Sequence, residues 1–246
     1  MADELMDELH AFLEENWDAD LTIGEWWERL GAAGWAAPIL PANAYGPTIA
    51  LAQHELARFG ITYQLYDALN AADVAAKISA NTKLIWLEAA GSVTMEFPDL
   101  LGIIRVGRER SVTTALDNTW GAGLAFNAFD IHGSGLGADI SVHALTKFPC
   151  GGADVLMGSV VTRNAALHQR LMDCHMRMGW GVGGADVDLI LRGLPSLPLR
   201  YARHDATARQ LALWLQSQAA VAQVLHPALA GSAGHDFWRA ACVTPT

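Results

Sequence analysis

The amino-acid sequence predicts an α/β fold, built on a mainly parallel sheet with helices on both faces. The chain has 246 residues, of which 52% are hydrophobic and 17% are charged, and this balance is typical of a compact fold with a large buried core. From residue 50 onward, short apolar runs alternate with helical patterns. Strands separated by helical patterns of about 10–15 residues indicate βαβ units, and therefore a parallel sheet.

The distribution of charge divides the chain into two parts. Residues 1–46 contain ten carboxylates and a single basic residue, Arg29, so they carry −9 of the net charge of −10. Apolar spacing predicts a short helical hairpin there, with helices over residues 3–17 and 22–30. We expect this acidic helical segment to occupy residues 1–42 and to end at Pro38 and Pro41, because proline cannot continue a helix.

The rest of the chain is predicted to alternate between strands and helices. Strands are expected over residues 61–66, 83–88, 112–116, 140–143, 155–162 and 221–225. Helices are expected over residues 50–59, 71–79, 98–110, 163–178, 184–193 and 199–218. The last strand stands alone near the end of the sequence and needs a partner.

Composition narrows the classes of function. An acidic chain with a pI near 5.2 argues against nucleic acid or a membrane surface as the main partner. The N-terminus lacks the basic start of a signal peptide, and no apolar run approaches the roughly 18 residues of a membrane span. The three cysteines form no CxxC pair and the histidines show no metal-binding spacing. We therefore expect a cytoplasmic protein without a metal, acting on a small molecule.

Two residues at predicted strand ends are candidate ligand-binding residues. Lys147 lies between an apolar strand and a Gly-rich turn, and the chain contains only two other lysines. A lysine amine in an apolar environment suits Schiff-base chemistry, although a lysine that extends to the surface fits the local pattern as well. Asp117 follows a buried strand and either faces a ligand at the sheet edge or forms an Asx turn.

Five ordered motifs carry a resemblance to a known family. They are Tyr45-Gly-Pro-Thr, Leu84-Ile-Trp-Leu-Glu-Ala-Ala-Gly-Ser-Val-Thr-Met-Glu96, Asp117-Asn-Thr-Trp120, Asp139-Ile-Ser-Val-His-Ala-Leu-Thr-Lys147 and Asp154-Val-Leu-Met-Gly158. Over about residues 43–246 the chain resembles the cystathionine β-lyase branch of the Cys/Met-metabolism PLP-dependent enzymes. The resemblance implies an incomplete fold-type-I large domain over residues 43–198. Residues 199–246 would then form a linking helix and the start of a truncated C-terminal domain.

The same resemblance implies pyridoxal 5′-phosphate (PLP) as cofactor and gives roles to four residues. Lys147 would form the Schiff base and carry the Cα proton, and Asp117 would pair with the pyridinium nitrogen. Thr146 would bind the cofactor phosphate. Tyr45 would stack on the pyridine ring and assist proton transfer, whereas considered alone it is an ordinary turn aromatic beside Gly-Pro. The implied reaction is α,β-elimination of cystathionine, or a related cysteine S-conjugate, to homocysteine, pyruvate and ammonia.

The chain also departs from the family pattern. It lacks the N-terminal arm and the Ser-Gly turn that reach the phosphate in relatives, and it lacks the C-terminal arginine that binds the substrate carboxylate. Ala90 replaces the usual proline, and Ala144 replaces a phosphate-binding serine. The alternative is therefore a truncated composite chain that binds PLP weakly or not at all and has no catalysis. Because relatives build the pocket across a dimer interface, we expect a homo-oligomer.

The first 42 residues resemble a different family, through Phe12-Leu-Glu-Glu-Asn and Gly24-Glu-Trp-Trp-Glu-Arg-Leu-Gly-Ala-Ala-Gly-Trp-Ala-Ala-Pro38. These runs are similar to the N-terminal helices of acyl-CoA dehydrogenases. They carry none of that family's flavin-binding or catalytic positions, so we expect no flavin.

Overall fold

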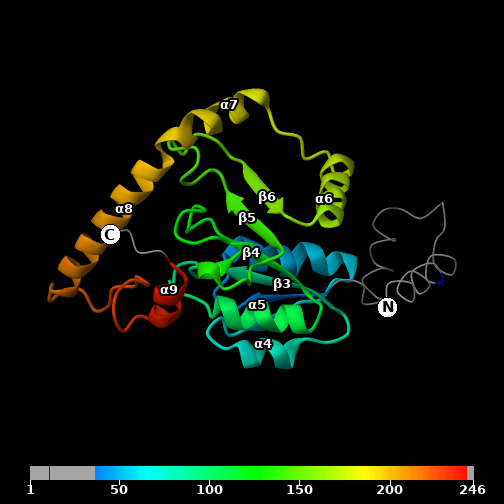
Figure 1. The fold of residues 1–246 in the computed structure, drawn as a ribbon, viewed down its shortest axis with the longest axis horizontal. Coiled ribbons are helices and arrows are strands. Elements are labelled where there is room, and N and C mark those ends of the chain that lie inside the picture. Colours follow the sequence, from blue (N-terminus) through cyan, green and yellow to red (C-terminus); the bar gives the residue numbers. More distant parts are fainter. Residues whose placement is uncertain (1–10, 12–36, 243–246) are drawn as a thin grey trace.

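The computed structural model describes residue 11 and residues 37–242. Its centre is a six-stranded sheet with the strand order β2-β1-β3-β4-β5-β6 (Figure 1). The neighbouring strands run parallel except for β5 and β6, which are antiparallel. The strands are β1 (Ala37–Pro41), β2 (Gln64–Tyr66), β3 (Thr82–Glu88), β4 (Thr113–Asp117), β5 (Ile140–Ala144) and β6 (Gly158–Thr162). The mainly parallel α/β sheet predicted from the sequence is confirmed.

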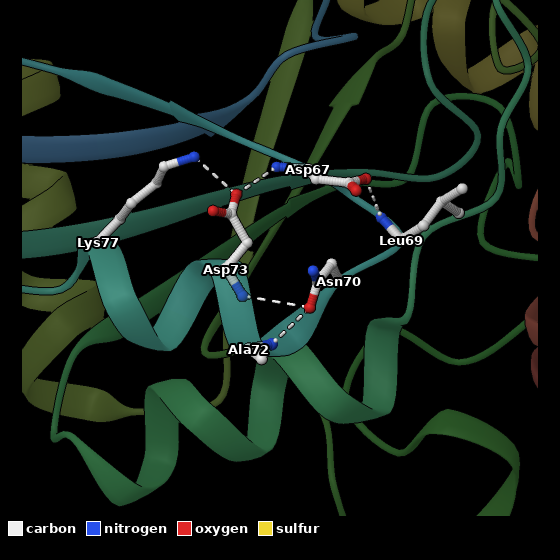
Figure 2. Close-up of polar contacts among 6 residues, drawn as sticks. All are labelled: Asp67, Leu69, Asn70, Ala72, Asp73 and Lys77. Atoms are coloured by element: carbon white, nitrogen blue, oxygen red, sulfur yellow. Dashed lines mark hydrogen bonds and ion pairs between the residues drawn. The ribbon is translucent and has the colours of Figure 1, made fainter.

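Helices connect most of the strands. The helical elements are α3 (Gly46–Ala50), η1 (Leu51–Glu55), η2 (Leu56–Phe59), α4 (Ala71–Lys77), α5 (Leu100–Glu109), η3 (Ile131–Gly133), α6 (Ala165–Arg177), α7 (Gly184–Gly193), η4 (Leu194–Ser196), α8 (Leu197–Gln216) and α9 (His235–Ala241). Side-chain caps set several of the helix starts. The Asn70 carboxamide accepts the backbone N–H groups of Ala72 and Asp73 at α4 (Figure 2). Asp99 and Asn164 cap α5 and α6 in the same way.

The core forms between one face of the sheet and α5. Side chains alternate along β3, so Ile85 and Leu87 point into the core while Trp86 and Glu88 face the other side. Ile103 and Ile104 of α5 are fully buried in the same core. In Figure 1, α4 and α5 lie together along the sheet, whereas α6, α7 and α8 form an arc at its other end. Both faces of the central strand β4 are covered, since the consecutive residues Thr114, Ala115 and Leu116 are all buried.

Strand β1 corrects the expectation for residues 37–41. The sequence places them in the acidic helical segment because Pro38 and Pro41 end helices, yet β1 pairs with both β2 and β3. The sheet accommodates the prolines because the register shifts between Ala37 and Pro38, and Pro41 is the last residue of the strand. Except for residue 11, residues 1–36 of the predicted helical segment lie outside the described residues.

The expected strand over residues 221–225 is wrong. This segment has no regular structure, because no other strand in the part of the chain that the structure describes lies beside it. It is followed by α9, which the sequence analysis did not identify. Among the described helices, none combines the length and apolar character needed to cross a bilayer.

Candidate functional site

The four residues selected from the sequence line one cavity of about 710 Å³, which we call the strand-end cavity. Asp117 is the last residue of β4 and Tyr45 directly precedes α3. Thr146 and Lys147 lie in the turn after β5. In an open parallel sheet, ligands bind beyond the carboxyl ends of the strands, and the volume is in the range of small-molecule sites.

Asp117 uses one carboxylate oxygen within the protein and leaves the other available. Its Oδ1 accepts the N–H of Thr119 at 2.9 Å, which is the Asx turn that the sequence allowed. Its second oxygen has no hydrogen-bond partner among the residues of the structure described here. The two readings of Asp117 are therefore compatible, because the turn fixes the carboxylate and one oxygen can still accept from a ligand.

Glu88 forms a second carboxylate in the wall of the same cavity. It ends β3 directly opposite Asp117 in the parallel register, so both side chains leave the sheet on the same face. Glu88 is only 4% exposed, and burial raises the pKa of its carboxyl above the ordinary value, with a smaller contribution from the charge of Asp117. The sequence pattern marks the end of this strand but assigns no role to Glu88.

The buried Glu88 carboxylate is compensated by hydrogen bonds. Both of its oxygens accept the backbone N–H of Tyr45, at 2.9 and 2.8 Å. The indole Nε1 of Trp86 and the hydroxyl of Ser92 also donate to it, at 3.0 and 3.3 Å. These bonds connect the end of β3 to the residue that precedes α3.

Lys147 is held by its turn and not by its side chain. Its N–H donates to the carbonyl of Ala144 at 3.1 Å, and the side chain is exposed. The Cys150 thiol donates to the carbonyl of Thr146 at 2.9 Å, and the N–H of Ala153 donates to the same sulfur at 3.2 Å. A buried thiol therefore organises the turn that carries the lysine.

Helix α8 supports this turn from outside the sheet. The Arg200 guanidinium donates from Nη1 to the carbonyl of Phe148 at 2.6 Å, and from Nη2 to the carbonyl of Gly193 at 3.0 Å. The rings of Phe148 and Tyr201 pack edge to face, with their centres 5.1 Å apart. The segment after Lys147 is therefore attached to α7 and α8.

The three lysines of the chain have different surroundings. Lys77 Nζ lies 2.6 Å from a carboxylate oxygen of Asp73 (Figure 2). Lys83 Nζ donates to the carbonyl of Ala80 at 3.2 Å. Within the described residues the amine of Lys147 has no such partner, and it alone among the three lines the strand-end cavity.

The other polar groups of the cavity complete its chemistry. Thr146 Oγ1 bonds to the backbone of Met157, accepting its N–H at 3.3 Å. His143 also lines the cavity. Burial lowers the pKa of its imidazole, and the charge of Asp117 opposes that effect. No group of three or more possible metal ligands occurs in the described part of the chain.

Comparison with known proteins adds independent evidence. The chain matches the family model "Cys/Met metabolism PLP-dependent enzyme" over residues 33–244. It is 35% identical over 199 residues to cystathionine beta-lyase of Bordetella avium, covering 81% of this chain and 48% of that protein. It is 34% identical over 203 residues to cystathionine beta-lyase of Escherichia coli (strain K12), covering 82% and 50%.

Solved structures show the same relationship. Cystathionine gamma-lyase from Lactobacillus plantarum, crystallised with L-serine, superposes with a TM-score of 0.80 and 25% identity, over 85% of this chain and 53% of that one. The chain spans about half the length of the curated relatives it matches. The match begins at residue 33 and therefore includes β1, which lies before the start of about 43 expected from the sequence motifs.

Proposed function

Because this chain belongs to the Cys/Met metabolism PLP-dependent enzyme family, we propose that it is a PLP-dependent carbon–sulfur lyase. The observation that carries the proposal is the convergence of Lys147, Asp117, Thr146 and Tyr45 on one cavity. The proposed reaction is α,β-elimination of cystathionine or a related cysteine S-conjugate. One cystathionine and one water give one homocysteine, one pyruvate and one ammonia, with cleavage of the bond between Cβ and sulfur.

The residues present fit the cofactor that the family requires. The unpaired amine of Lys147 is available to a carbonyl carbon, and the second oxygen of Asp117 is available to a protonated ring nitrogen. Tyr45 is about half exposed and lines the cavity, where its ring can cover the face of a flat ring. We propose that the Thr146 hydroxyl binds the cofactor phosphate.

Bound PLP supplies an electron sink for the electron pair left at the substrate Cα. The protein residues then control protons and orientation. We propose that the Lys147 amine moves the Cα proton, while the Tyr45 hydroxyl assists this transfer. Asp117 keeps a positive charge on the ring nitrogen by accepting its hydrogen bond, and the Asx turn at Thr119 keeps that carboxylate in place.

One feature favours a second candidate, a chain that binds PLP weakly or not at all and does not catalyse. Lys147 is the only lysine or arginine among the described residues that line the cavity, whereas phosphate is bound most strongly by arginine and by backbone N–H groups at helix starts. A second copy of the chain would complete such a site, and we keep the homo-oligomer as part of the proposal.

Adding PLP to the purified protein and recording the visible spectrum tests the proposal. We expect the absorbance band of lysine-bound PLP in the wild type and its loss in Lys147→Ala, because only Lys147 presents its amine to the cavity. Lys83→Ala is the matched control and should keep the band. Identical spectra for wild type and Lys147→Ala would overturn the proposed site.

Pyruvate release from cystathionine then separates the two candidates. Turnover that disappears in Lys147→Ala supports the lyase. A protein that shows the band but releases no pyruvate would contradict the lyase and support the non-catalytic binder. Size-exclusion chromatography in the same buffer tests the oligomer, which a single monomer peak would contradict.

A further inference from the structure

We propose that Glu88 is a positioning residue, which holds the backbone of Tyr45 so that the tyrosine ring faces the strand-end cavity. This inference rests on the proposed function, because the ring is positioned for a cofactor in that cavity. The hydrogen bonds between these two residues go to the backbone N–H of Tyr45 and not to its ring. Glu88 acts on the backbone amide of Tyr45, and through it on the ring.

The hydrogen bonds fix Tyr45 on both sides of its Cα atom. Its N–H is bound by both carboxylate oxygens of Glu88, at 2.9 and 2.8 Å. Its carbonyl accepts the N–H groups of Thr48 and Ile49 at the start of α3, at 2.8 and 3.2 Å. These bonds set the direction in which the side chain leaves the backbone, and only two side-chain torsions then place the ring.

Glu88 is itself fixed before it binds Tyr45. It ends β3 in the hydrogen-bonded register with β4, and Trp86 and Ser92 donate to its two oxygens. A buried carboxylate is costly unless it is well hydrogen-bonded. The Glu88 carboxylate is therefore a rigid acceptor at the edge of the cavity. The segment before α3 is hydrogen-bonded to this carboxylate through Tyr45.

Two variants of Glu88 test whether its position or its charge matters, because an amide can also accept hydrogen bonds at this place. In Glu88→Gln the side-chain oxygen can still accept from Tyr45 and Trp86 at the Oε1 position. The NH₂ group, which replaces the second acceptor of the Tyr45 N–H, turns away from that N–H and donates to the Ser92 hydroxyl. In Glu88→Asp the charge stays, but the carboxylate is withdrawn by one methylene and loses its reach to Tyr45. Position and charge are thereby separated.

Backbone amide hydrogen exchange at Tyr45, measured without cofactor, is the first readout. We expect strong protection in the wild type and Glu88→Gln, and exchange about tenfold faster in Glu88→Asp and Glu88→Ala, since a hydrogen bond to a charged group is lost. Glu109→Ala removes an exposed acid at the far end of α5 and should leave Tyr45 unchanged. Protection that survives in both Glu88→Asp and Glu88→Ala would overturn the inference.

The second readout is the dissociation constant of PLP, together with the visible circular dichroism of the bound ring. We expect Glu88→Gln to match the wild type, and Glu88→Asp and Glu88→Ala to bind about tenfold more weakly with an altered dichroism signal. The reverse pattern, in which Asp matches the wild type and Gln does not, would show that charge matters and would overturn the positioning role. If the wild type itself binds no PLP, the proposed function fails, and Tyr45 exchange still decides whether Glu88 fixes that backbone.

Discussion

The two walls of the strand-end cavity are built in different ways. The acidic wall, formed by Glu88 and Asp117, belongs to the sheet, where paired strands fix both residues side by side. The lysine turn, residues 145–157, lies outside the sheet and is held by a few side chains, above all its own Cys150 and Arg200 of α8. The position of the acids therefore depends on the fold as a whole, whereas the position of Lys147 depends on a small number of local contacts.

The largest loss of stability is expected from a substitution at the contact between α7 and the lysine turn. A Cβ atom on Gly193 would lie 2.1 Å from the carbonyl oxygen of Pro149 and 2.6 Å from that of Cys150. Both atoms belong to the backbone, so Gly193→Ala must displace the turn or the helix. We expect the free energy of unfolding to fall by about 1–3 kcal/mol and PLP binding to weaken.

Gly184→Ala provides the matched control for that experiment. It changes a glycine of the same helix whose Cβ would meet no atom within 4 Å. Denaturation curves of the two variants should therefore differ clearly, with the control close to the wild type. Equal stability of the two variants would contradict the dependence of the lysine turn on close packing with α7.

A smaller change in stability is expected from the titration of Glu88 in the acidic wall. Burial raises the pKa of Glu88 above its ordinary value of 4.5, so the charged form is disfavoured more in the folded than in the unfolded chain. The stability associated with this group is complete below pH 4.5 and decreases as the pH rises through the folded pKa. The glutamine of Glu88→Gln does not titrate. As the pH rises from 4.5 through the folded pKa of Glu88, the free energy of unfolding of the wild type should therefore fall relative to that of Glu88→Gln.

Urea denaturation of both proteins at a series of pH values from 4.5 upward measures this difference. A wild type that gains stability relative to Glu88→Gln as the pH rises would show that the hydrogen bonds outweigh the burial. That result would contradict the raised pKa of Glu88.

The contrast between the walls also explains how much the sequence could predict. Alternating apolar runs predicted the parallel sheet and most of its strands, because burial on both faces leaves a strong local pattern. Asp117 and Lys147 could be selected because they follow such runs. Strand β1 was missed because local rules treat Pro38 and Pro41 as breakers, whereas the sheet tolerates them at an irregularity and at a strand end.

The contacts that support the site were less accessible to sequence reasoning. Arg200 is 52 residues away from Phe148, and Glu88 is 43 residues away from Tyr45, so no local pattern connects them. The signal for Glu88 was its place at a strand end, beside the more conspicuous Asp117. Such pairings depend on the tertiary structure, which brings distant segments together.

Reductive trapping of PLP shows directly whether Lys147 is the lysine that binds the cofactor. After the protein is incubated with PLP and treated with borohydride, peptide mass spectrometry shows which lysine carries the cofactor. We expect the label on Lys147 and little on Lys77 or Lys83, whose amines are bound to Asp73 and to the Ala80 carbonyl. Labelling spread equally over the three lysines, or absent from Lys147, would contradict it.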